Sequence, residues 1–116
     1  MAAGTTITAQ TGSLFGGDEL TMTAVDDTNG NKILIDDKTI IVVESSGAAV
    51  TATLNSVADL NERTGDITVT LDSGEIGYLY PSRPAAFRQK TGDNAGYALV
   101  TFSAGTMTIG AFRYRV

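Results

Sequence analysis

The clearest hydrophobic pattern in the sequence lies between Asn29 and Leu54, where three short apolar runs are separated by polar turns. The runs are Ile33 to Ile35, Ile40 to Val43, and the alternating residues Val50, Ala52 and Leu54. Short runs that are rich in β-branched side chains and bounded by Asp, Asn, Gly or Ser are typical of strands. The stretch is therefore predicted to form a β-meander of three consecutive strands.

The middle run, Ile40 to Val43, has four apolar residues in succession. Consecutive side chains of a strand point to opposite faces of the sheet, so this strand has an apolar side chain on each face. We expect it to be covered on both sides, either by a second sheet and a loop or by another protein chain.

Further strands are predicted on both sides of this stretch. They are Leu20 to Val25, Asp66 to Asp72, Glu75 to Tyr80, Tyr97 to Ser103, and a last strand that begins after the Ala104-Gly105 turn. About eight short antiparallel strands with short connections are typical of an all-β protein, and we expect a single-domain β-sandwich of jelly-roll type over residues 19–116.

The last strand changes its apolar face partway along. Met107 and Ile109 share one parity, whereas Phe112 and Tyr114 share the other, which predicts a β-bulge near Gly110.

Two segments are each compatible with two local structures. Residues 56–65 are compatible with one or two helical turns or with a crossing loop, and residues 85–90 with an extended piece or a helical turn.

Residues 1–18 combine Gly, Thr and Ala with few apolar side chains. Such a segment buries too little surface to offset its loss of conformational entropy, so an extended N-terminal arm is predicted. One interpretation is a disordered tail. The other is an arm whose Ile7, Leu14 and Phe15 contact a neighbouring subunit.

The chain of 116 residues contains no cysteine and no histidine. Disulfides, thiolate metal sites, the commonest general base and the usual nucleophile pairs are thereby excluded. We therefore expect a protein that is not an enzyme and that has no cofactor. No apolar segment approaches the roughly 20 residues that a membrane-spanning helix needs, and no membrane partner is expected.

Charge is distributed unevenly. Residues 1–82 carry twelve acidic and three basic residues, whereas residues 83–116 carry five basic residues and one acidic residue. This polarity suits head-to-tail contact between copies or docking on a charged scaffold, although scattered solvated charges explain it equally well. The basic candidates for such contacts are Arg83, Arg88, Arg113 and Arg115. No continuous basic face indicates binding to nucleic acid.

Tyr78 and Tyr80 share one face of a predicted strand. They are candidates for stacking on a sugar or for packing at a subunit interface. Asp27, Asn29 and Asn31 have the first spacings of a calcium loop, but Lys32 and Lys38 occupy the positions of its glycine and its closing glutamate. The pattern therefore argues against calcium.

From Ala24 to Arg113 the sequence resembles the small decoration, or cement, proteins of tailed-bacteriophage heads. The segments that carry the resemblance combine strand and turn motifs. They are Ala24-Val25-Asp26 leading into Gly30-Asn31, Asp37-Lys38-Thr39 before Ile40 to Glu44, Ser45-Ser46-Gly47-Ala48-Ala49 before Val50 to Thr53, Asp66 to Leu71 with Ser73-Gly74-Glu75, and Val100 to Ser103 with Ala111-Phe112.

The resemblance implies a structural virion protein on the outer surface of an icosahedral capsid. It would stabilise the capsid by bridging subunits of the major capsid protein near local threefold axes, as a homotrimer. Alternative hypotheses are another phage structural component, such as a tail or head-completion protein, and a carbohydrate-binding β-sandwich module.

Overall fold

The computed structural model describes residues 3–11, 19–57, 65–81 and 83–114, and these residues form an all-β structure without an α-helix. The elements are β1 (Thr5–Ile7), β2 (Gln10–Thr11), β3 (Thr23–Ala24), β4 (Asn31–Ile33), β5 (Thr39–Ser45), β6 (Val50–Leu54), β7 (Ile67–Leu71), β8 (Ile76–Leu79), a 3-10 turn η1 (Pro84–Ala86), β9 (Ala98–Phe102) and β10 (Met107–Arg113). The all-β class expected from the sequence is confirmed.

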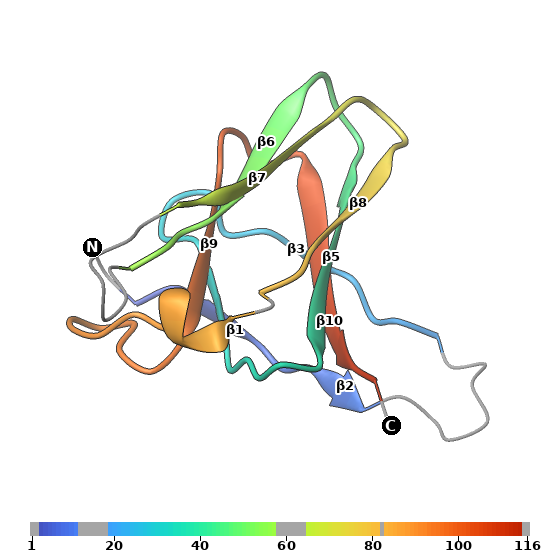
Figure 1. Ribbon diagram of the computed structural model, residues 1–116. Helices are drawn as coiled ribbons and strands as arrows, with labels where there is room; N and C mark the ends of the chain where they lie inside the picture. The colour runs from blue at the N-terminus through green and yellow to red at the C-terminus, as the bar shows by residue number, and fades with distance from the viewer. Residues whose placement is uncertain (1–2, 12–18, 58–64, 82, 115–116) are drawn as a thin grey trace.

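The strands form two sheets that share one core (Figure 1). The first sheet has the order β1-β4-β9-β6-β7, and the second has the order β2-β10-β5-β8, with β3 also paired to β10. Most neighbours are antiparallel, but β1 pairs with β4, and β2 with β10, in parallel. The expectation of about eight short antiparallel strands is therefore confirmed only in part, because it omitted the two short N-terminal strands, which pair in parallel.

The predicted meander is also wrong. Its three runs became β4, β5 and β6, of which β4 and β6 lie in the first sheet and β5 in the second. Among the described strands, β6 and β7 are the consecutive pair that hydrogen-bonds directly, with Val50 opposite Leu71 and Leu54 opposite Ile67. Apolar alternation determines which face of a strand is buried, but any other strand can supply the backbone partners.

The core lies between the inner faces of the two sheets. The alternation that predicted β6, β7 and β9 places the expected side chains inward, and in β5 the inward residues are Ile41 and Val43. The strand residues whose apolar side chains have no exposed surface come from both sheets and are Ile33, Ile41, Val43, Ala52, Leu54, Leu79, Ala98, Val100 and Ile109.

Part of the expected N-terminal arm belongs to the sheets. In Figure 1, β1 and β2 run consecutively along the lower side of the molecule and join opposite sheets. The Thr5 N–H donates to the Gly30 carbonyl at 3.1 Å. Ile7 is buried in the core, so its assignment to a contact with a neighbouring subunit is corrected: it packs within its own chain. Leu14 and Phe15 lie outside the described residues.

Strand β10 has no bulge. Its register against β5 is continuous from Met107 opposite Ser45 to Arg113 opposite Thr39. Gly110 lies on the outer face, where a Cβ atom would come within 2.7 Å of the Thr21 carbonyl oxygen and 2.9 Å of the Met22 sulfur. The glycine thus makes room for a crossing segment, and this explains the gap in the apolar pattern that suggested a bulge.

Candidate interaction surfaces

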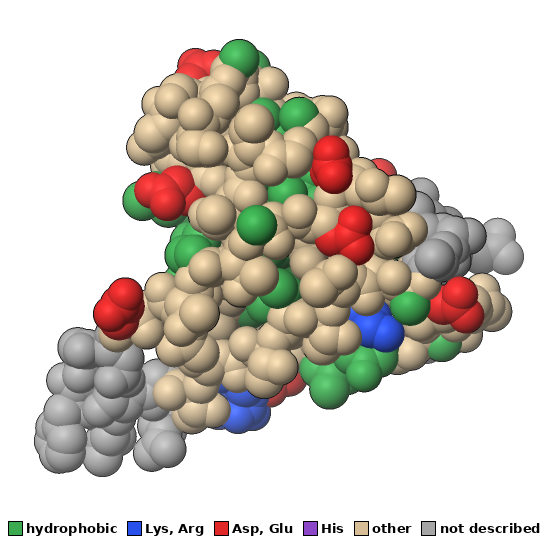
Figure 2. All heavy atoms as spheres, turned by 180° about the vertical axis from the view of Figure 1, so that it is seen from behind, with side chains coloured by type: hydrophobic (Ala, Val, Ile, Leu, Met, Phe, Trp, Pro, Cys, Tyr) green, Lys and Arg blue, Asp and Glu red, His purple; other side chains and the backbone are tan. Residues whose placement is uncertain are grey.

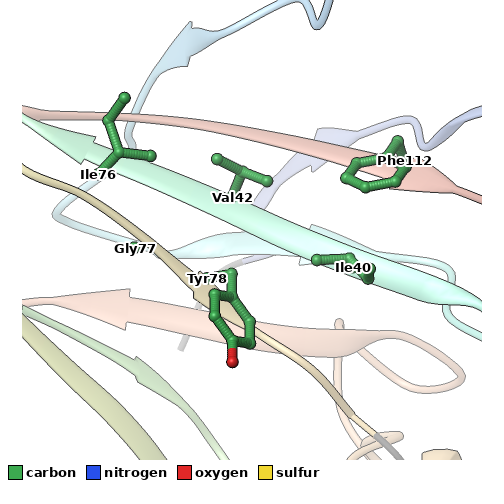
Figure 3. Close-up of a pocket in the computed structure, with 6 residues that line it drawn as sticks. All are labelled: Ile40, Val42, Ile76, Gly77, Tyr78 and Phe112. Atoms are coloured by element: carbon green, nitrogen blue, oxygen red, sulfur yellow. The ribbon is translucent and has the colours of Figure 1, made fainter. Parts of the chain in front are cut away.

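The outer face of the second sheet carries a group of apolar side chains, which we call the apolar face. It consists of Ile40 and Val42 of β5, Ile76 and Tyr78 of β8, and Phe112 of β10. The register explains the grouping, because Ile40 lies opposite Phe112 and Val42 lies opposite Tyr78. Figure 3 shows the five side chains on the same side of the sheet.

The apolar face is shallowly concave. Its side chains and Gly77 line an open hollow of about 360 Å³. Ile76 is 66% exposed and Tyr78 is 69% exposed, which is unusual for side chains of this size. Large apolar groups that gather on an exposed surface indicate a site of contact with another molecule.

A second group of side chains converges on the turn between β4 and β5, residues 35–38. The Arg88 guanidinium donates to the Ile35 carbonyl at 2.7 Å, and the Tyr80 hydroxyl donates to the Asp37 carbonyl at 2.8 Å. Arg113 forms an ion pair with the Asp36 carboxylate. Three predicted interface residues from distant parts of the chain therefore hold one turn of their own chain in place.

Asp36 is the electrostatic centre of this turn. Burial acts to raise the pKa of its carboxyl group, but hydrogen bonds from Arg113, the Lys38 N–H and the Thr39 hydroxyl outweigh burial and lower the pKa. The Lys38 N–H lies 2.9 Å from the carboxylate and the Thr39 hydroxyl 3.0 Å. Asp36 is therefore a charged structural anchor of the turn.

The two tyrosines that were predicted to act together have different environments. Tyr78 is largely exposed, whereas the Tyr80 hydroxyl bonds the turn and lies 3.4 Å from the Tyr114 hydroxyl. This contact with Tyr80, followed by burial, raises the pKa of Tyr114. Tyr78 is therefore the more accessible of the two rings for stacking on a sugar.

In the loop with calcium-like spacing, the polar side chains of Asp26 and Asn31 form hydrogen bonds with groups of their own chain. Asp26 accepts hydrogen bonds from the Thr5 hydroxyl at 2.8 Å and from the Asn29 N–H at 3.0 Å. The hydrogen bond from the Asn29 N–H is the largest cause of the lowered pKa of Asp26, followed by that from Thr5. The buried Asn31 amide accepts from the Asp26 N–H and donates to the Thr5 carbonyl.

Of the remaining predicted site residues, the structure describes only Arg83. Arg83 lies in an exposed position just before η1, and Arg115 falls outside the described residues. Within the described ranges, no group of three or more acidic side chains is placed to hold a metal ion, and no helix has the length and apolar character to span a membrane. Figure 2 shows acidic side chains spread over the back of the molecule, where basic ones are few.

Sequence reasoning missed four members of the apolar face: Ile40, Val42, Ile76 and Phe112. The signal was present in part, because the uninterrupted run Ile40 to Val43 requires an apolar residue on the outer face. What was missing was the pairing of β5 with β8 and β10, which places Ile76 and Phe112 beside it.

No known family, no curated protein and no solved structure matches this chain.

Proposed function

We propose that this protein decorates and stabilises the icosahedral capsid of a tailed bacteriophage. In this role it binds the outer surface of the assembled shell as a homotrimer and bridges neighbouring subunits of the major capsid protein. It acts through its surfaces, without catalysis and without a cofactor. The proposal takes the two packed sheets as the layers of a β-sandwich, of the jelly-roll type expected from the sequence.

The observation that carries the proposal is the apolar face. Ile76 and Tyr78 project from β8 beside a hollow that is mostly apolar, and such a surface suits another protein better than a polar small molecule. The sequence resemblance to decoration proteins then supplies the kind of protein partner.

The physical basis of such a role is linkage. A protein that binds the assembled shell but not its separated subunits stabilises the shell by mass action. Many copies, each with a modest interface, add their contributions through multivalency. A small β-protein with an exposed apolar face meets these requirements.

The proposal is tested with capsids assembled from the major capsid protein of the genome that encodes this chain. The purified protein should co-sediment with expanded capsids and raise their melting temperature in calorimetry. The variant Tyr78→Ser should bind more weakly, whereas Thr70→Ser, on the exposed outer face of the first sheet, should bind normally. Absence of co-sedimentation at saturating protein would refute the function.

Truncation of the first 18 residues is a poor test of an arm. It removes β1 and β2 together with the buried Ile7, so it changes the fold as well as the reach of the chain.

The exposed Tyr78 also favours a second candidate, a carbohydrate-binding module, because an exposed ring can stack on a sugar. Retention on a glycan array together with no capsid binding would favour that candidate.

A further inference from the structure

The apolar face has opposite charges at its two ends. In β5 the outward positions are Ile40, Val42 and Glu44, which alternate with the buried Ile41 and Val43. The ladder with β10 continues one residue beyond the strand, because the Tyr114 N–H donates to the Lys38 carbonyl at 3.1 Å. Lys38 therefore occupies the next outward position, four residues before Val42.

We propose that the apolar face binds the same face of a second copy of this chain about a two-fold axis. The inference rests on the part of the proposed function that makes this face a protein contact. The axis passes near the middle of β5, and the two β5 strands run in opposite directions across the contact. Lys38 of each copy then faces Glu44 of the other.

Charge complementarity favours a second copy of the chain as the partner of the apolar face. The outward sequence Lys38, Ile40, Val42, Glu44 matches itself when it is reversed: base meets acid at both ends, and apolar meets apolar between them. A copy placed in the same direction would instead bring Lys38 to Lys38 and Glu44 to Glu44. Like charges in direct contact are unfavourable, so the antiparallel arrangement is selected.

In this arrangement β8 lies across from β8 of the second copy, and β10 lies across from β10. Ile76 and Tyr78, the most exposed side chains of the apolar face, therefore meet the same edge of the other copy. Strand β8 is the last strand in its sheet, so its outward side chains can extend toward the second copy. Two such sheets pack at about 10 Å with interdigitating side chains.

The apolar face is also the surface on which the proposed function rests, so a copy that binds the shell through this face is released from the two-fold contact. In dilute solution the two-fold contact gives a dimer. Its formation can therefore be measured on purified protein, independently of any capsid.

The first experiment uses crosslinking. The natural chain has no cysteine, so single cysteines can be introduced cleanly. Val42→Cys lies near the proposed axis, and Thr53→Cys is the matched control, an outward residue of β6 in the first sheet that is also half-buried. With a short bismaleimide, Val42→Cys should give a covalent dimer at least tenfold faster than Thr53→Cys. Equal rates would overturn the proposal.

The second experiment reverses charges. Lys38→Glu and Glu44→Lys should each raise the dimer dissociation constant about tenfold or more in sedimentation analysis, because each places like charges at both ends of the contact. The double variant restores both pairs and should recover the natural affinity. Far-ultraviolet circular dichroism shows that each variant is folded.

The outcomes separate the inference from the proposed function. A natural protein that stays monomeric at every concentration, or a double variant no better than the single ones, would overturn the two-fold contact. If those variants nevertheless lose capsid binding, the apolar face contacts the shell, and the decoration role stands. Self-association without any capsid binding would overturn the decoration role and retain the contact.

Discussion

The outer faces of the two sheets are built on the same kind of strand but have opposite chemistry. The first sheet exposes a face of threonines, and the second exposes the apolar face. The threonines lie opposite one another on adjacent strands and are Thr51, Thr53, Thr68, Thr70 and Thr101. The Thr51 and Thr70 hydroxyls are 2.8 Å apart.

The difference shows that strand formation does not explain the apolar face. Threonine is β-branched and fits a pleated surface much as valine and isoleucine do, while its hydroxyl remains hydrated. In the first sheet, threonine occupies outward positions of the strands, so this fold does not need apolar side chains there. Strand formation therefore does not require the apolar side chains of Ile40, Val42, Ile76, Tyr78 and Phe112.

The largest expected effect distinguishes the inner face of β5 from its outer face. Ile41→Ala should lower the free energy of unfolding by about 3 kcal/mol, because Ile41 is fully buried and the substitution leaves a cavity. Ile40→Ala, one residue away on the half-buried outer face, should cost roughly 1 kcal/mol. Urea unfolding followed by circular dichroism measures both, and equal losses would contradict the assignment of faces.

The next effect concerns the segment that crosses the second sheet. Gly110→Ala should cost about 2 kcal/mol, since its Cβ atom would meet the Thr21 carbonyl oxygen and the Met22 sulfur and displace that segment. Gly65→Ala is the control, because a Cβ atom there meets nothing within 4 Å. Thermal unfolding compares the two variants, and a fully stable Gly110→Ala protein would argue against the crossing segment.

A smaller effect depends on pH. The pKa of Asp36 is lower in the folded protein than the value of about 3.9 in an unfolded chain, so this carboxylate stabilises the fold at pH values above about 4. The contribution is lost as the pH falls through the folded pKa. Asp36→Asn should cost roughly 1 kcal/mol at pH 7 and should make the loss of stability below pH 4 shallower.

Asp37→Asn is the control for this prediction. Asp37 holds the turn through its backbone carbonyl, which accepts from Tyr80. Its substitution should therefore leave the acid-induced loss of stability in place. Urea unfolding between about pH 2.5 and pH 7 measures both variants. Identical pH profiles for Asp36→Asn and the natural protein would show that the ion pair with Arg113 does not contribute.

The smallest effect on stability comes from making the two outer faces alike. The double variant Ile76→Thr, Tyr78→Thr replaces two exposed side chains by the residue that the first sheet uses. Its free energy of unfolding should change by less than about 1 kcal/mol. Binding of a hydrophobic dye should fall clearly. A large loss of stability with unchanged dye binding would mean that these side chains support the fold instead.

Local patterns predicted β5, β6, β7, β8 and β9 to within one or two residues, because each has the period-two alternation or the apolar run of a buried strand. The strand expected over residues 20–25 is reduced to β3, Thr23–Ala24, since Leu20 and Met22 cross the outer face instead of extending the ladder. The 3-10 turn at Pro84–Ala86 begins one residue before residues 85–90, where a helical turn was one alternative. The two N-terminal strands have no sequence signal, because each is stabilised by a partner distant in the chain.

The sites were less predictable than the strands. Tyr80, Arg88 and Arg113 were singled out for their type, but their hydrogen bonds to residues 35–38 depend on contacts across at least 43 positions of the chain. Nothing in the local sequence of an arginine or a tyrosine distinguishes a surface contact from an internal anchor. Their geometry was decided when the strands that carry them packed together.

The sequence by itself determined the all-β class, the strands of the chain's middle and the side chains that face the core, because alternation along a strand is a local property. The tertiary structure alone decided which strands are neighbours, since every backbone offers the same hydrogen-bonding groups and the choice depends on how the sheets pack. That choice placed Ile76 and Phe112 beside Ile40 and Val42. The apolar face is therefore a product of pairing between strands that lie far apart in the sequence.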